Sequence, residues 1–313
     1  MKHLLTLSDL SPAELRYLID LTEYFKKKRL IGEKSEDILR GKTLGLVFQK
    51  PSTRTRVSLE VAILELGGRS IYMDWRTLQL ARGEPIKDTA RVLSRYLDGI
   101  IARVYEHETL VEMAKYSRVP IINALSNMYH PIQAISDMFT LREHFGTLDK
   151  LKVTFIGDGG SNVCHSLLLA CTMLGVSISI ASPPQYRPHE KVLEKALKYA
   201  EKSGSKVEVT DDPVKAVEGA DAVYTDVFVS MGFEAEREER LKVFIPKYRI
   251  TVKLMKKAKP DAVFMHCLPA KRGEEVEEEV LEDEKISIVW TQAENRLHSA
   301  KAILSYIYGG RYL

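Results

Sequence analysis

The stretch "TLGLVFQKPSTRTRVSLEVAILE" (43–65) decides the fold, because its sequence pattern changes within a few residues from that of a strand to that of a helix. Its first six residues form a short apolar run that is typical of a buried strand. A helical pattern follows from about Thr53, with Ser52 or Thr53 as the capping residue. A strand that leads directly into a helix begins a strand–helix–strand unit, so this stretch favours a parallel sheet.

The same alternation continues along the 313 residues. Strands are expected at 43–48, 69–73, 98–104, 119–125, 152–157, 177–182, 206–210, 222–227, 262–267 and 287–292, with helical patterns between most of them. The alternation predicts an α/β fold of two doubly wound domains with parallel sheets, and an active site in the cleft between them.

The turn-rich segment "REHFGTLDKL" (142–151) is the expected boundary between the domains. We expect one domain at 1–145 and a second at 146–292. A final helix, at about 293–313, is expected to fold back and join the first domain.

Composition and charge restrict the class of protein. Apolar residues make up 45% of the chain and charged residues 28%, which predicts a packed globular protein. The net charge of +3 gives no reason to expect a nucleic-acid or membrane partner, and no apolar run approaches the roughly 20 residues that span a bilayer. Three cysteines without a signal sequence favour reduced thiols in the cytoplasm.

Ligands of doubly wound sheets bind beyond the carboxyl ends of the strands, so the residues that follow each strand are the candidates. In "STRTR" (52–56) the capped helix start and Arg54 suit a phosphate. A capped, solvent-exposed helix start with incidental arginines would have the same sequence pattern. Arg103 ends an apolar strand, and His130 and Gln133 follow another. Together these residues predict a pocket, rich in hydrogen-bond donors, for a small anion that carries a carbonyl group.

The second half opens with "FIGDGGSNV" (155–163), a glycine turn between a strand and a helix. A dinucleotide site is disfavoured, because Asn162 replaces the third glycine and the next strand ends in "ASPP" without an acidic residue. Asp226 ends a later strand, where it could bind a substrate ammonium group or simply cap a helix. Cys267 ends another strand and is expected to be a polar ligand for an amine, with His266 on the opposite face of the strand.

Six motifs, in this order, resemble the aspartate/ornithine carbamoyltransferase family nearly end to end. They are "STRTR" (52–56), "DTARVLSRYLDGIIAR" (88–103), "HPIQAISD" (130–137), "DVFVSMG" (226–232), "HCLPA" (266–270) and "AENRLH" (293–298). The "SMG" and "HCLP" motifs are similar to those of the ornithine enzymes rather than the aspartate enzymes.

The resemblance implies that 1–145 binds carbamoyl phosphate and 146–292 binds ornithine, and that the carbamoyl group passes to the δ-amine of ornithine to give citrulline. It implies carbamoyl phosphate ligands at Ser52, Thr53, Arg54, Thr55, Gln79, Arg103, His130, Gln133 and Arg296. It implies ornithine ligands at Asn162, Asp226, Ser230, Met231, Cys267 and Leu268. Arg103, His130, Asp226 and Cys267 are the expected catalytic residues.

The resemblance also implies a homotrimer, sometimes assembled further, without a metal or an organic cofactor. Aspartate, putrescine and N-acetylated or succinylated ornithine stay open as acceptors, although Asp226 favours one with a free α-amine. A metabolite sensor on the same fold and a nicotinamide-linked oxidoreductase are the rival classes of function.

Overall fold

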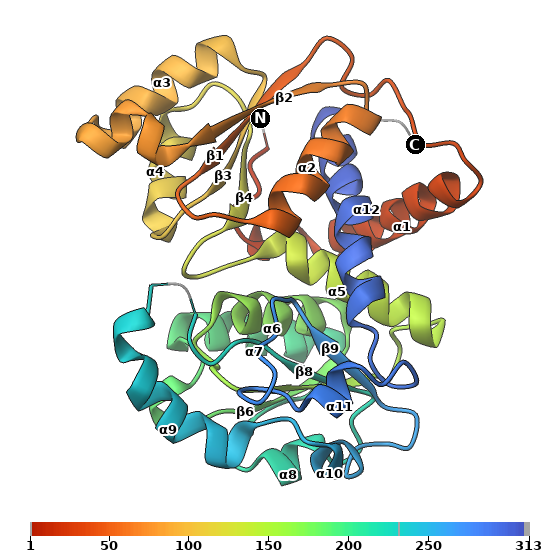
Figure 1. Cartoon of the computed structure of the whole chain (residues 1–313). Helices are drawn as coiled ribbons and strands as arrows, with labels where there is room; N and C mark the ends of the chain where they lie inside the picture. The colour runs from red at the N-terminus through yellow and green to blue at the C-terminus, as the bar shows by residue number, and fades with distance from the viewer. Residues whose placement is uncertain (1, 231, 310–313) are drawn as a thin grey trace. The chain divides into compact units, whose positions relative to one another are not determined.

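The computed structural model describes residues 2–230 and 232–309, and Figure 1 shows the whole chain. The chain divides into two compact units. Unit 1 comprises Met1–Phe139 with Glu294–Leu313, and unit 2 comprises Thr140–Ala293. The division falls within two helices, α5 (Pro131–Phe145) and α12 (Val289–Tyr308).

Unit 1 contains a four-stranded parallel sheet in the order β2-β1-β3-β4. Its strands are β1 (Thr43–Phe48), β2 (Arg69–Asp74), β3 (Gly99–Arg103) and β4 (Ile121–Leu125). Its helices include α1 (Pro12–Leu30), α2 (Thr53–Glu65), α3 (Ile86–Tyr96) and α4 (His107–Tyr116). The chain moves from β1 to one neighbour and later returns to the other side, so the topological switch point lies between β1 and β3.

Burial distinguishes the edge strand β2 from the other strands of unit 1. Every residue of β3 and β4 is buried, as expected for parallel strands whose two faces are covered. The edge strand β2 is only partly covered, and its Ile71 side chain is 48% exposed. The helix α1 begins with a capping box in which Ser11 and Glu14 satisfy each other's backbone amides.

Unit 2 contains a five-stranded parallel sheet in the order β7-β6-β5-β8-β9. Its strands are β5 (Lys152–Ile156), β6 (Ser177–Ala181), β7 (Val207–Thr210), β8 (Ala222–Thr225) and β9 (Val263–His266). Its helices include α6 (Asn162–Leu174), α7 (Glu190–Ser203), α8 (Pro213–Val217), α9 (Arg237–Tyr248), α10 (Val252–Met255) and α11 (Glu278–Leu281). Figure 1 shows α6 and α7 on one face of this sheet and α8, α10 and α11 on the other. The switch point of unit 2 lies between β5 and β8.

The expected strand at 287–292 is wrong. Ser287 makes only an isolated bridge to Phe264, and the helix α12 begins at Val289. The β-branched run favoured a strand, but the backbone amide of Gln292 makes a helical bond to Ile288 while its side chain hydrogen-bonds the His266 amide and the Tyr224 hydroxyl. Tertiary contacts therefore override local propensity here. The last helix accordingly starts four residues before the expected 293.

Among the residues that the structure describes, no helix combines the length and the apolar character needed to cross a bilayer.

Candidate functional site

The switch point of unit 1 gathers residues that are far apart in the sequence. Arg296 of α12 donates from Nη2 to the Thr55 hydroxyl (2.5 Å) and from Nη1 to Gln133 Oε1 (2.8 Å). Gln133 in turn donates to Asp137 Oδ1 (2.7 Å). All four side chains are buried. Three of the predicted ligands thus form one hydrogen-bonded cluster, which we call the unit 1 site together with Ser52, Thr53, Arg54, Arg103 and His130.

His130 lies directly before α5 and is only 3% exposed. Burial lowers its pKa well below the usual value, and the positive charges of Arg296 and Arg103 lower it further. These effects keep the imidazole uncharged near neutral pH. A neutral imidazole can donate one hydrogen bond without adding another charge to a site already rich in cations.

Two neighbouring strand ends provide the rest of the unit 1 site. Arg103 is the last residue of β3, is buried, and pairs in register with Phe48 of β1. Beyond β1, the side chain of Ser52 caps α2 by accepting a hydrogen bond from the Thr55 amide (3.3 Å). The first turn of a helix presents amides without intrahelical acceptors, and the helix dipole adds partial positive charge there. Together with Arg54, Arg103 and Arg296, this helix start makes the site suitable for an anion.

Three residues near this site differ from the simple sequence pattern. The Arg56 guanidinium stacks on the Tyr72 ring, 3.6 Å from its centroid, and donates a hydrogen bond to Glu60 of the same helix. Its contacts are therefore with neighbouring side chains and not with the hydrogen-bonded cluster. Gln79 is exposed at the start of a short 3-10 helix, Gln79–Arg82, and no hydrogen bond between the described residues joins it to the cluster. Lys50, which the sequence pattern did not single out, is buried with its ammonium 3.8 Å from the centroid of the Tyr105 ring. Its position two residues after the end of β1 was the available signal.

The switch point of unit 2 carries an acidic group instead. Asp226 follows β8, and its Oδ1 accepts hydrogen bonds from the Cys267 thiol (3.0 Å) and the Val227 amide (2.8 Å). Burial raises the pKa of Asp226, while these two hydrogen bonds act in the opposite direction. Both donors use the same oxygen, so Oδ2 is the atom that can take a substrate cation. Asn162, the first residue of α6, Ser230 and Leu268 are half-buried, and with Asp226 and Cys267 we call them the unit 2 site.

Met231 lies outside the described residues. The preceding residue, Ser230, is described, and the Ser230 carbonyl accepts a hydrogen bond from the Phe233 amide (3.1 Å).

His266 has both ring nitrogens engaged. Nδ1 accepts a hydrogen bond from the Leu268 amide (2.8 Å), which leaves Nε2 as the donor to Glu275 Oε1 (3.2 Å). The sequence predicted His266 on the face of the strand opposite Cys267, because side chains alternate along a strand. That alternation does not extend to Cys267, since β9 ends at His266. As a result, a His266 nitrogen lies within 4.8 Å of the Cys267 sulfur and an Asp226 oxygen. Those three atoms could approach a metal ion, but His266 would have to give up one of its existing bonds.

A buried ion pair in unit 2 was missed from the sequence. Asp158, two residues after β5, pairs with Arg240 of α9, and both are buried. Asp158 belongs to the "GDGG" turn, in which the sequence pattern singles out the glycines and the following Asn162. Sequence spacing offers no sign of its partner, which lies 82 residues away.

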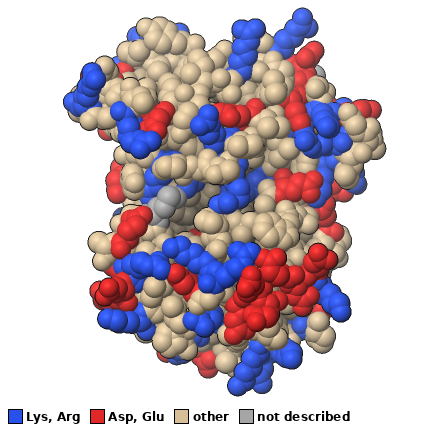
Figure 2. Space-filling model, in the orientation of Figure 1, with Lys and Arg blue, Asp and Glu red and all other residues tan. Residues whose placement is uncertain are grey.

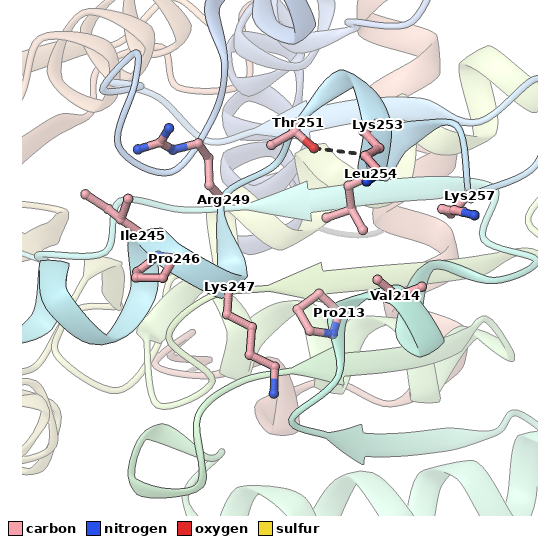
Figure 3. A pocket seen from close by; sticks show the side chains of 10 residues that line it. All are labelled: Pro213, Val214, Ile245, Pro246, Lys247, Arg249, Thr251, Lys253, Leu254 and Lys257. Carbon is pink, nitrogen blue, oxygen red and sulfur yellow. Dashed lines mark hydrogen bonds between the residues drawn. The ribbon is translucent and has the colours of Figure 1, made fainter.

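A surface hollow of about 490 Å³ also lies in unit 2, and none of the predicted site residues lines it. Figure 3 shows four basic side chains, from Lys247, Arg249, Lys253 and Lys257, around apolar groups that include Ile245. Arg249, Lys247 and Lys257 point away from one another in this view, and Lys247 pairs with Asp211 at 3.4 Å. These cations therefore do not converge on one point of the hollow.

Surface charge is mixed on the face of the molecule shown in Figure 2. Its broadest acidic area lies over α11, where the sequence runs "EEVEEEVLEDE" (274–284). The charges that distinguish the two sites are mostly buried, so they act at short range rather than through a general surface field.

Family models match almost the whole chain. The carbamoyl-P binding domain of aspartate/ornithine carbamoyltransferase matches residues 2–143, and the Asp/Orn binding domain of the same family matches residues 149–307.

Full-length relatives agree with that match. An ornithine carbamoyltransferase of Staphylothermus marinus is 54% identical over 304 residues, covering 97% of this chain and 96% of the relative. An anabolic ornithine carbamoyltransferase of Pyrococcus furiosus is 52% identical over 309 residues, covering 99% and 97%.

Solved structures are similar over the same length. The ornithine carbamoyltransferase structure from Pyrococcus furiosus has a TM-score of 0.94 at 51% identity, covering 99% of this chain and 97% of that one. The anabolic enzyme from Campylobacter jejuni has a TM-score of 0.91 at 42% identity, covering 99% and 100%. The α/β fold with two parallel sheets is thereby confirmed, and the chain belongs to the aspartate/ornithine carbamoyltransferase family.

Proposed function

We propose that this protein transfers the carbamoyl group of carbamoyl phosphate to the δ-amine of L-ornithine, releasing L-citrulline and phosphate. The observation that carries the proposal is the buried, hydrogen-bonded cluster of Thr55, Gln133 and Arg296. His130 lies close enough to Arg296 and Arg103 for their positive charges to lower its pKa. These groups provide donors and positive charge at one switch point, as an anion with a carbonyl group requires. The names of the full-length relatives support ornithine as the acceptor.

In the proposed donor site, the start of α2 and Arg54 hold the phosphate. Ser52 and Thr53 contribute from the same turn, and Gln79 completes the site from its exposed loop. The positive end of the helix favours the negative charge that builds up on the departing phosphate.

Thr55, Arg103 and His130 are proposed to face the carbonyl oxygen, with Gln133 and Arg296 completing the shell around it. Attack of the amine creates a tetrahedral intermediate in which that oxygen becomes negative. One well-placed donor of this kind typically contributes about 3–4 kcal/mol to the transition state. Because the pKa of His130 is lowered by burial, we assign it a hydrogen-bonding role rather than the role of a proton donor.

In the proposed acceptor site, Asp226 binds the α-ammonium group of ornithine. Asn162, Ser230 and Met231 hold the amino-acid end, while Cys267 and Leu268 lie beside the δ-amine. A comparable alkyl amine has a pKa of about 10.4 in water, and only the neutral amine can attack. Desolvation beside Cys267 and Leu268 favours that neutral form. The leaving phosphate can accept the proton, so the mechanism requires no separate protein base.

A homotrimer in the cytoplasm is part of the same proposal. Gln79 lies exposed shortly after the edge strand β2, where the proposed assembly would cover it. Light scattering would measure the subunit number directly. The anabolic relatives support a role in arginine biosynthesis.

The test is citrulline formation from carbamoyl phosphate and ornithine, beside matched reactions with aspartate, putrescine and N-acetylornithine. Turnover with ornithine alone is the expected result. Turnover with another amine would move the acceptor assignment and keep the donor site. Binding of carbamoyl phosphate without turnover of any amine would favour a sensor.

A further inference from the structure

Two loops of unit 2 carry the proposed ornithine ligands, and they follow neighbouring strands. The turn after β5 leads to Asn162 at the start of α6, and the loop after β8 carries Asp226 and Ser230. Recognition of one amino acid by both loops requires a fixed spacing between them. A direct link at the strand ends is the hydrogen bond from the Thr225 hydroxyl to the Ile156 carbonyl (2.6 Å).

Arg240 connects these loops from a third element. This side chain of α9 is 2% exposed, and its Nε donates to the Phe228 carbonyl (2.8 Å) in the loop after β8. Its Nη2 donates to Asp158 in the turn after β5. The rings of Tyr186 and Phe233 lie 4.6 and 4.8 Å from the guanidinium carbon, which holds the fork in place.

Asp158 passes this constraint to Asn162. Its Oδ1 accepts a hydrogen bond from the Gly160 amide (2.9 Å), and its backbone carbonyl accepts one from the Ser161 amide (3.1 Å). Ser161 then caps α6 by accepting from the Cys164 amide (3.2 Å). Asp158 therefore shapes the turn that places Asn162 as the first residue of the helix.

We infer that Asp158 and Arg240 form a positioning pair that sets the distance between the two acceptor loops, and so determines which amino-acid acceptor fits. This inference rests on the proposed function and adds residues that do not themselves touch the substrate. A planar guanidinium can donate in two directions at once, whereas a lysine ammonium is a single point on a flexible stem. Arg240→Lys keeps the charge but cannot hold both loops in the same geometry.

Initial-rate kinetics on the purified full-length protein give the first test. For Arg240→Lys we expect the KM for ornithine to rise about tenfold or more, while the KM for carbamoyl phosphate stays within about twofold. The preference for ornithine over lysine, which is one methylene longer, should narrow about tenfold, because one methylene in a fitted pocket is worth roughly 10–200-fold in selectivity. A purely structural role would lower the folded fraction without changing that ratio.

Arg237→Lys is the matched control. Arg237 lies on the same helix and pairs with Glu274 at the surface, so the same substitution should leave both KM values and the ornithine-to-lysine ratio unchanged. Asp158→Asn provides the reciprocal variant, because asparagine keeps an acceptor for the Gly160 amide and loses the charge that meets Arg240. It should shift the ratio in the same direction as Arg240→Lys.

Calorimetric binding of norvaline separates this inference from the proposed function, because norvaline retains the amino-acid end of ornithine and lacks the attacking amine. Weaker norvaline binding to Arg240→Lys than to the wild type and to Arg237→Lys supports the positioning pair. If the wild type turns over ornithine and Arg240→Lys keeps its ornithine KM, its norvaline affinity and its selectivity, the inference is wrong. Failure of the wild type to form citrulline would reject the proposed function instead.

Discussion

The two sites have the same topology and opposite chemistry. In each unit the switch point lies beside a central strand that leads to a serine-capped helix, Ser52 at α2 and Ser161 at α6. The unit 1 site gathers arginines and an uncharged histidine around its helix start, whereas the unit 2 site presents Asp226. In the proposed function, sheet topology sets where each substrate binds, and a few side chains set the sign of the charge that each substrate must carry.

The largest effect is expected from removing a cation of the unit 1 site. Arg103→Gln should lower kcat by about 10²–10³-fold, because it removes a donor to the developing oxyanion. Initial rates at saturating ornithine measure this loss. Arg56→Gln is the control from the same motif region, since Arg56 stacks on Tyr72 and should tolerate the change. Equal losses in both variants would contradict the assignment of Arg103.

Removing the acid of the unit 2 site should have the next largest effect. Asp226→Asn should raise the KM for ornithine by roughly 10–100-fold, because a hydrogen bond to a charged group is worth about 1.5–3 kcal/mol. Binding of carbamoyl phosphate, measured by calorimetry, should not change. Weaker binding of carbamoyl phosphate to Asp226→Asn would contradict the assignment of Asp226 to the ornithine site alone.

Mild acid should destabilise unit 1 more than unit 2. The pKa of His130 is lowered by burial, and burial lowers that of His298 in α12 to about 4, so unit 1 loses stability as pH falls from about 6.5 towards about 4. His298 alone accounts for a loss on the order of 2–3 kcal/mol. Burial raises the pKa of Asp158 and Asp226, and groups shifted in that direction favour the folded state more at lower pH.

Hydrogen exchange, followed separately in residues 2–139 and 140–293, measures this difference. Amides of unit 1 should lose more protection than those of unit 2 between pH 7 and about pH 5. His298→Leu should reduce the loss in unit 1. Equal loss of protection in both units of the wild type would contradict the expected difference.

The two helix caps give the smallest and most closely matched test. Ser52→Ala and Ser161→Ala each remove one bond to a first-turn amide, so each should lower the free energy of unfolding by about 1 kcal/mol in urea titrations. Only Ser52→Ala should also raise the KM for carbamoyl phosphate. A similar rise in Ser161→Ala would mean that the cap acts through stability alone.

The sequence by itself determined the succession of strands and helices, because short apolar runs and capping residues act locally. It placed β1 at 43–48 and located Arg103, His130 and Asp226 at or just beyond strands. It also identified the family, since "STRTR" and "HCLP" are contiguous motifs. Local propensity failed at 287–292, where contacts of Gln292 with His266 and Tyr224 favoured a helix.

Only the tertiary structure decided which side chains meet. Arg296 reaches Thr55 across 241 residues of sequence and Gln133 across 163, while Arg240 meets Asp158 across 82. The direction of a buried arginine depends on the packing of distant helices, and no local pattern encodes it. The same holds for Arg56, which belongs to the "STRTR" motif in sequence but stacks on Tyr72 in the fold. Sequence thus sets most of the strands and helices and the charges they carry, whereas packing sets the partners of those charges and the start of α12, because hydrogen bonds act only over a few ångströms.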